Sequence, residues 1–176
     1  MQKVTPEKFY RAFLDAIEKN GFVNTWYSNG KWTKGLLKDR DCVMKRVADK
    51  LGLIYCNEYF TLDGVFYRKT IKYGDLEYGQ NIEIILECEN DWRTITKEIW
   101  KIFPLFFAPL KVVITYPRDK QKAEEIKNII KDRIKNDDPF GLHKNKIKTL
   151  LIFGHMENKK IIWQGFIYKN KTFIKL

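Results

Sequence analysis

The apolar and polar residues of this chain follow two periods, one typical of helices and the other of strands. A helical stripe follows Thr5-Pro6-Glu7, which is a strong helix start, and Asn20-Gly21 is a typical helix end. A second helical stripe runs from about Leu36 to Leu51, with Gly52 as its stop. The sequence therefore predicts a helix over about 5–19 and a second helix before the first strand.

Strand-like alternation begins at Asn57 and continues to Lys69. The pair Asp63-Gly64 lies within this segment, and Asp-Gly is preferred in tight hairpin turns. We therefore expect a β-hairpin that turns at Asp63 and Gly64. Residues 69–81 contain further turn signals and are expected to form a polar connection.

The stretch from Asn81 to Pro117 predicts a strand, a helix and a second strand. Because strand side chains alternate, the first strand should have one face of Ile82, Ile84, Leu86 and Cys88 and another of Glu83, Ile85, Glu87 and Glu89. Asn90 and Asp91 are good helix caps, and the apolar run from Leu110 to Tyr116 is typical of a buried parallel strand. The expected βαβ unit places the acids at the carboxyl edge of its first strand, where open α/β sheets keep their sites.

The last third predicts one helix and three strands. Asp119 is a good cap for the helix, and Asp137-Asp138-Pro139 should end it. Strands are expected near Leu150–His155, Ile161–Tyr168 and Thr172–Leu176. The order of elements predicts a single domain over 1–176 with a mixed α/β (α+β) fold, in which helices flank a mixed central sheet.

Composition narrows the class of protein. The chain has 176 residues, of which 44% are hydrophobic and 15% aromatic, so it can bury a sizeable core. No apolar run approaches the roughly 18 residues of a membrane span, and the first residues lack a signal-peptide core, so we expect a cytoplasmic protein without a membrane partner. Three cysteines without CxxC spacing and two distant histidines argue against a disulfide framework or a thiolate zinc site.

Positive charge is concentrated near the end of the chain. The net charge is +11; residues 1–116 hold 18 Lys and Arg against 15 Asp and Glu, whereas residues 117–176 hold 15 against 7. This asymmetry favours a polyanionic partner such as nucleic acid, although a genome with AT-rich codons gives a similar composition. Trp26, Tyr27 and Trp32 lie among lysines and could stack on bases, but we favour their anchoring a loop to the core.

Three carboxylates form the strongest candidate for chemistry. Glu87 and Glu89 share a strand face, and Asp63 lies on the preceding hairpin. Such a cluster can hold Mg²⁺, a hard cation that takes oxygen ligands and assists hydrolysis of a phosphodiester. The alternatives are that Asp63 only stabilises a turn and that the two glutamates keep an edge strand soluble. We favour the metal site, because two acids on a central strand repel unless a metal ion or protonation relieves them.

This arrangement resembles the core of the restriction-endonuclease-like nucleases, the PD-(D/E)XK superfamily, over about residues 36–117. The resemblance implies that Asp63 and Glu87 bind Mg²⁺ or Mn²⁺, that the Cys88 carbonyl is a further ligand, and that Glu89 stands at the position of the usual catalytic lysine. A glutamate at this position resembles the pattern of the BamHI-like branch, where the glutamate acts as a base or as a metal ligand. Alternatively, Lys97 or Lys101 of the following helix supplies the lysine.

The function implied by the resemblance is a metal-dependent endonuclease that hydrolyses DNA, with catalytic residues Asp63, Glu87 and Glu89. The N-terminal helix 5–19 and a basic α/β extension over 118–176 would flank the nuclease-like core, and lysines and arginines of the extension would track the backbone. The missing lysine keeps two alternatives open: a nucleic-acid-binding module without catalysis, and a partner-binding protein. The sequence leaves open the choice between DNA and RNA and the formation of a homodimer.

Overall fold

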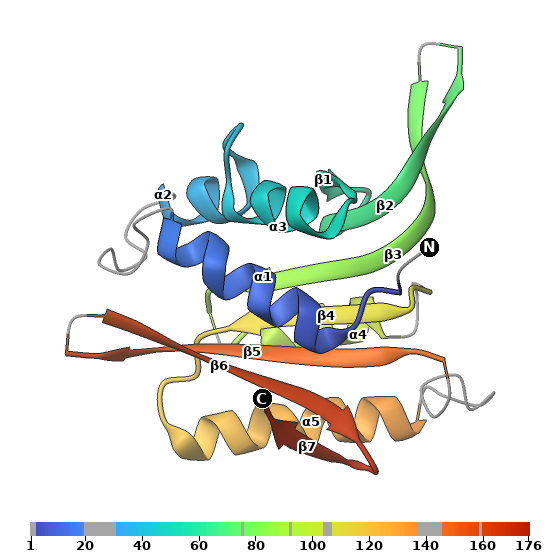
Figure 1. Cartoon of the computed structure of the whole chain (residues 1–176). Coiled ribbons are helices and arrows are strands. Elements are labelled where there is room, and N and C mark those ends of the chain that lie inside the picture. Colours follow the sequence, from blue (N-terminus) through green and yellow to red (C-terminus); the bar gives the residue numbers. More distant parts are fainter. Residues whose placement is uncertain are drawn as a thin grey trace.

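A mixed β-sheet of seven strands forms the centre of the molecule in the part of the chain that the structure describes (Figure 1). The structure is a computed structural model that describes residues 3–19, 31–74, 76–91, 93–103, 107–136, 146–158 and 160–176. The strand order follows the chain: β1 (Ile54–Tyr59), β2 (Leu62–Tyr73), β3 (Leu76–Glu89), β4 (Leu110–Thr115), β5 (Lys148–Glu157), β6 (Lys160–Lys169) and β7 (Thr172–Lys175). β3, β4 and β5 are parallel and the outer pairs are antiparallel.

Helices cover both faces of this sheet and bury two separate hydrophobic clusters (Figure 1). Helices α1 (Pro6–Lys19) and α3 (Val43–Leu51) pack on one face, together with the short α2 (Lys31–Thr33) and the π-helical turn η2 (Lys34–Lys38). Helices α4 (Ile95–Ile102) and α5 (Lys120–Asn136) pack on the other. The predicted mixed α/β fold is therefore confirmed.

Helix α1 confirms the prediction for the N-terminal stripe and connects the start of the chain to its end. The Thr5 hydroxyl accepts a hydrogen bond from the Lys8 N–H at 3.3 Å, as a capping residue does. Phe13 packs edge-on against Trp163 of β6, with ring centroids 4.9 Å apart. The Tyr10 hydroxyl donates to the Trp163 carbonyl at 3.0 Å. These contacts fix α1 across β5 and β6.

The predicted single helix from Leu36 to Leu51 is wrong, because the chain forms η2, a turn and then α3. The turn is stabilised by a 2.9 Å hydrogen bond from the Cys42 N–H to the Asp39 carbonyl, and the Cys42 thiol accepts from the Lys45 N–H as the cap of α3. Gly52 ends α3 in the left-handed conformation with a φ of 67°, as its position in the sequence predicts.

The predicted turn at Asp63-Gly64 is also wrong, because both residues lie inside β2. β1 and β2 instead turn at Phe60 and Thr61, with Tyr59 paired to Leu62. Gly64 serves a close approach: a Cβ there would lie 2.7 Å from the ring of Tyr55. The Asp-Gly pair therefore reflects packing of an aromatic ring on the strand.

Residues 69–81 do not form the expected polar connection. β2 and β3 continue as a two-stranded ribbon from Lys69, paired with Gln80, to Tyr73, paired with Leu76. Figure 1 shows this ribbon extending beyond the rest of the sheet. Tyr73 and Tyr78 pack across it with centroids 6.2 Å apart, a cross-strand aromatic pair that favours strand over coil.

A bulge in β3 corrects the predicted face of Ile82. Phe66 pairs with Ile84 but Tyr67 pairs with Ile82, so Glu83 is an extra residue in β3. Ile82 consequently packs in the α4–α5 cluster, whereas Ile84 lies in the α1–α3 cluster. From Ile84 onward the predicted alternation holds, which places Ile85 and Glu87 on the face that α4 covers.

The βαβ unit β3–α4–β4 is present as predicted, with a parallel β3–β4 pair. α4 begins later than expected, at Ile95, because Asp91 first forms a turn in which its carbonyl accepts from the Thr94 N–H and hydroxyl. Asp119 caps α5 as predicted, with a 2.8 Å hydrogen bond from the Lys122 N–H. The three predicted C-terminal strands are confirmed. Residues 137–139, which were expected to end α5, lie outside the described residues, as does Pro104 after α4.

Trp32 confirms the predicted anchoring role for the aromatic segment, while Trp26 and Tyr27 lie outside the described residues. The side chain of Trp32 is buried, stacks on Trp163 and donates a hydrogen bond from Nε1 to the Tyr116 hydroxyl at 2.7 Å. In the described ranges, no helix is long and apolar enough to cross a membrane.

Candidate carboxylate and lysine site

Two of the predicted acids are brought together by strand pairing. Asp63 is the second residue of β2, and Glu87 lies near the carboxyl end of β3. Because Gly64 pairs with Leu86 in an antiparallel ladder, Asp63 lies beside Glu87. The Asp63 Oδ2 accepts a 2.7 Å hydrogen bond from the N–H of Cys88, which fixes the carboxylate next to that of Glu87.

Glu87 is fully buried at the centre of this site. Neither of its carboxyl oxygens has a partner in hydrogen-bonding geometry among the described residues. Burial, followed by the neighbouring charge of Asp63, raises the pKa of Glu87 to about 10. Burial also raises the pKa of Asp63, although the Cys88 N–H and Lys101 oppose that shift. Without a further cation, Glu87 therefore keeps its proton at neutral pH.

Lys101 of α4 contacts Glu87 and also Glu98 of its own helix. Its Nζ is 3.1 Å from Glu87 Oε1 and 2.5 Å from Glu98 Oε2. It also donates to the Thr61 carbonyl at 2.6 Å, at the turn that precedes Asp63. Burial lowers the pKa of Lys101, but Glu98 and Glu87 outweigh burial and raise it. The helix after the acidic strand thus supplies an ammonium group to this strand, whereas Lys97 is exposed.

Glu89 and Cys88 have different surroundings. The Glu89 carboxylate accepts a 2.8 Å hydrogen bond from the Asp91 N–H, so it stabilises the turn after β3. Cys88 contributes its N–H to Asp63 and packs its side chain against the α1–α3 cluster. The roles of Glu89 and of the Cys88 carbonyl as metal ligands stay predictions.

Sequence reasoning missed Glu98 and Thr115. Glu98 and Lys101 are three residues apart on α4, a spacing that places them on one helix face, so the helical period could have found the pair. Thr115 ends β4 and pairs with Glu89, and its buried hydroxyl has no hydrogen-bond partner among the described residues. Because most residues of β4 are apolar, its pattern predicts a buried strand and does not indicate a polar group at its end.

The donor set fits a divalent cation that keeps part of its water shell. Among the described residues, no group of three or more His, Cys, Asp or Glu side chains is placed to hold a metal ion. Mg²⁺, however, is often bound by only one or two carboxylates, with water and substrate phosphate oxygens as its other ligands. Asp63 and Glu87 supply two adjacent carboxyl groups, and the oxygen of Glu87 that does not face Lys101 has no hydrogen-bond partner among the described residues, which fits such an ion.

Comparisons with known proteins leave the family of this chain open. No protein-family model and no curated protein matches the sequence. Among solved structures, the chain matches part of a crystal structure of the central domain of yeast acetyl-CoA carboxylase, with 6% identity and a TM-score of 0.38. That match covers 96% of this chain and 34% of the yeast chain.

Proposed function

We propose that this protein is a Mg²⁺-dependent nuclease that hydrolyses phosphodiester bonds, with DNA as its expected substrate. The observation that supports the proposal is the placement of Asp63 beside Glu87 on paired strands, with the ammonium group of Lys101 3.1 Å from Glu87 Oε1. These groups supply the charges that phosphodiester hydrolysis needs, namely ligands for a divalent cation and a fixed positive charge near the reacting phosphate.

In this proposal each group has a separate role. Asp63 and Glu87 would hold Mg²⁺ or Mn²⁺, and Glu87 would give up its proton when the cation binds. The bound cation supplies charge neutralisation and a more acidic water. Lys101, held by Glu98 and the Thr61 carbonyl, would donate hydrogen bonds to a phosphate oxygen or to the attacking water. Lys101 would therefore take the role of the usual catalytic lysine, whose position in the sequence pattern is occupied by Glu89.

Glu89 and the Cys88 carbonyl are additional candidate ligands in this proposal. One oxygen of the Glu89 carboxylate already accepts a hydrogen bond from the Asp91 N–H. A Glu89→Gln variant that keeps most of its activity, compared with a Lys101→Met variant that loses it, would assign the lysine role to α4.

The direct test is cleavage of plasmid and branched DNA with Mg²⁺ or Mn²⁺. Replacing a carboxylate that binds the cation removes both charge neutralisation and positioning, so Glu87→Gln should reduce the cleavage rate by at least about a hundredfold. Glu83→Gln is the matched control, because Glu83 lies on the same strand but pairs with Arg68 away from the site. Equal cleavage by the wild type and Glu87→Gln would remove the proposed site.

A second candidate is a nucleic-acid-binding module of the same fold without catalysis. One observation favours it: the ammonium of Lys101 already contacts both Glu87 and Glu98, so the site has a positive charge of its own. For such a module, calorimetry should show no Mg²⁺ binding while DNA binding keeps a steep dependence on salt.

A further inference from the structure

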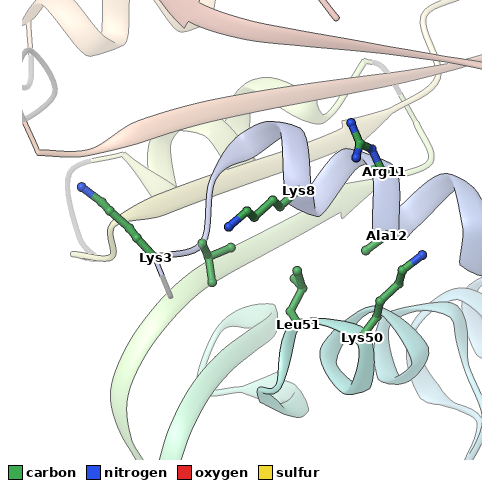
Figure 2. Close-up of a pocket in the computed structure, with 7 residues that line it drawn as sticks. Lys3, Lys8, Arg11, Ala12, Lys50 and Leu51 are labelled. Atoms are coloured by element: carbon green, nitrogen blue, oxygen red, sulfur yellow. The ribbon is translucent and has the colours of Figure 1, made fainter. Parts of the chain in front are cut away.

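A small cavity lies between α1 and the end of α3 (Figure 2). These helices cover one face of the sheet, whereas Glu87 and Lys101 lie on the face that α4 covers. Its volume is about 200 Å³, and Val4, Ala12 and Leu51 form its apolar lining. The remaining lining residues are all cationic: Lys3, Lys8, Arg11 and Lys50. The cavity is therefore lined by four positive side chains and by no carboxylate.

Most of this charge is uncompensated. Among the described residues, Lys3, Lys8 and Arg11 form no ion pair, and Lys50 pairs with Asp15 of α1. Figure 2 shows that these side chains come from three parts of the chain: the segment before α1, α1 itself and α3. All four cations are exposed, and the charged ends of Lys3, Lys8 and Arg11 lie apart in Figure 2. An anion in the cavity would attract groups that have no ion-pair partner among the described residues, and these long side chains would turn toward it.

A neighbouring cavity between the same helices provides an internal comparison. It shares Ala12 and Lys50 with the first cavity, but three aspartates line it: Asp15, Asp41 and Asp49. Each of these aspartates is in an ion pair, with Lys50, Arg46 and Lys45 respectively. One end of the α1–α3 groove is thus neutralised by the protein itself, whereas the other end is not.

Two local features make the unpaired cations costly for the free protein. Lys8 lies in the first turn of α1, where the positive end of the helix dipole favours acids and disfavours cations. Lys8 and Arg11 are three residues apart on the same helix face, a spacing at which like charges repel. A bound anion would relieve both effects.

We propose that this cavity binds a phosphate group. A phosphate offers several strong acceptor oxygens to Lys8 and Arg11, and the guanidinium fork of arginine matches phosphate oxygens in pairs. The same chemistry is present in inorganic phosphate and in a nucleic-acid backbone. The proposal does not rest on the nuclease function, because the cavity and the acidic site lie on opposite faces of the sheet.

Thermal unfolding in inorganic phosphate is the first test, at constant ionic strength set with chloride. The wild-type melting temperature should rise with phosphate concentration, because a ligand of the folded state stabilises it. A Lys8→Gln/Arg11→Gln variant should lose this rise, and in chloride alone it should melt no lower than the wild type, since two unfavourable charges are gone. Lys19→Gln/Lys45→Gln removes two charges near the neutral cavity and should respond to phosphate as the wild type does.

Binding of a single-stranded oligonucleotide, followed by fluorescence anisotropy, distinguishes the two sources of phosphate. If the cavity takes a backbone phosphate, Lys8→Gln/Arg11→Gln should flatten the salt dependence of log K by up to about 1.4, and inorganic phosphate should compete. If it takes free phosphate only, the oligonucleotide affinities of the two double variants should agree while their thermal responses differ. The proposal is wrong if phosphate does not stabilise the wild type, or if both double variants respond equally to it.

Discussion

Glu87 carries a carboxyl group that the fold removes completely from water, beside a second carboxyl group on Asp63. Its pKa of about 10 lies far above the ordinary value of 4.5, so between these pH values the folded chain holds a proton that the unfolded chain has released. Such a group stabilises the folded state at low pH, and this contribution is lost as the pH rises toward 10.

A Glu87→Gln variant should therefore lose less stability than the wild type between pH 5.5 and pH 8.5. One proton bound only by the folded state contributes a slope of up to about 1.4 kcal/mol per pH unit, and glutamine does not titrate. Urea unfolding at three pH values gives the slope of the unfolding free energy against pH for each protein. The difference between the two slopes reports Glu87 alone, because the other ionisable groups contribute equally to both. Parallel slopes would show that Glu87 is ionised in the folded protein.

Phe60 has an energetically unfavourable backbone conformation. It lies in the two-residue turn between β1 and β2 with a φ of 56°, and its side chain is 75% exposed. A left-handed conformation is unfavourable for a residue with a Cβ, and hairpin turns favour glycine there.

We expect Phe60→Gly to increase the free energy of unfolding by about 0.5–1 kcal/mol, since relief of the backbone outweighs the added entropy of glycine in the unfolded chain. Phe107→Gly is a suitable control, because Phe107 is 69% exposed but has no positive φ. Chemical denaturation of both variants checks the expectation, and a loss of stability in Phe60→Gly would contradict the argument from the turn.

At the scale of elements, the contact between β5 and the aromatic side chains of the α1–α3 face depends on Gly154. A Cβ at this position would lie 2.7 Å from the Tyr116 ring and 2.9 Å from that of Trp163. These rings pack against each other and against Trp32, so neither can move without disturbing the other two.

Gly154→Ala should therefore destabilise the protein by about 1–3 kcal/mol, the usual range for overpacking a core. The same substitution should cost less in a Tyr116→Leu background, where the shorter side chain leaves space for the methyl group. Denaturant unfolding of the four proteins in this cycle gives the coupling energy. Additive effects would mean that the two residues do not clash.

Element type was predictable for most long periodic patterns, with the exception of Leu36–Leu51, where η2 and a turn precede α3. The stripes of α1 and α5 and the apolar run of β4 predicted their elements because each buries one face or both. The pattern failed where one residue type has two uses: the Asp63-Gly64 pair indicates a turn, but Tyr55 needs the glycine for packing. It also failed at the bulge of β3, since a single extra residue at Glu83 reverses the face of Ile82.

At the scale of the whole molecule, the site was predictable in part. Alternation along β3 and the neighbouring hairpin indicated Asp63 and Glu87, and the following helix offered Lys101 as one of two lysines. The contact of Lys101 with the Thr61 carbonyl and its choice over Lys97 depend on how α4 crosses the sheet, which no local pattern specifies. The stacking of Trp32 on Trp163 could not be predicted either, because these residues are far apart in sequence and no local pattern relates them.

The packing of α1 on β6 has a consequence for how the chain is made. Each strand pairs with a neighbour in sequence, so the sheet can grow strand by strand as the ribosome releases it. Helix α1 emerges before all seven strands, yet Tyr10 and Phe13 contact Trp163, which lies in β6 and is translated after five of them. The contacts that these side chains make with β6 therefore cannot form until the ribosome has released that strand.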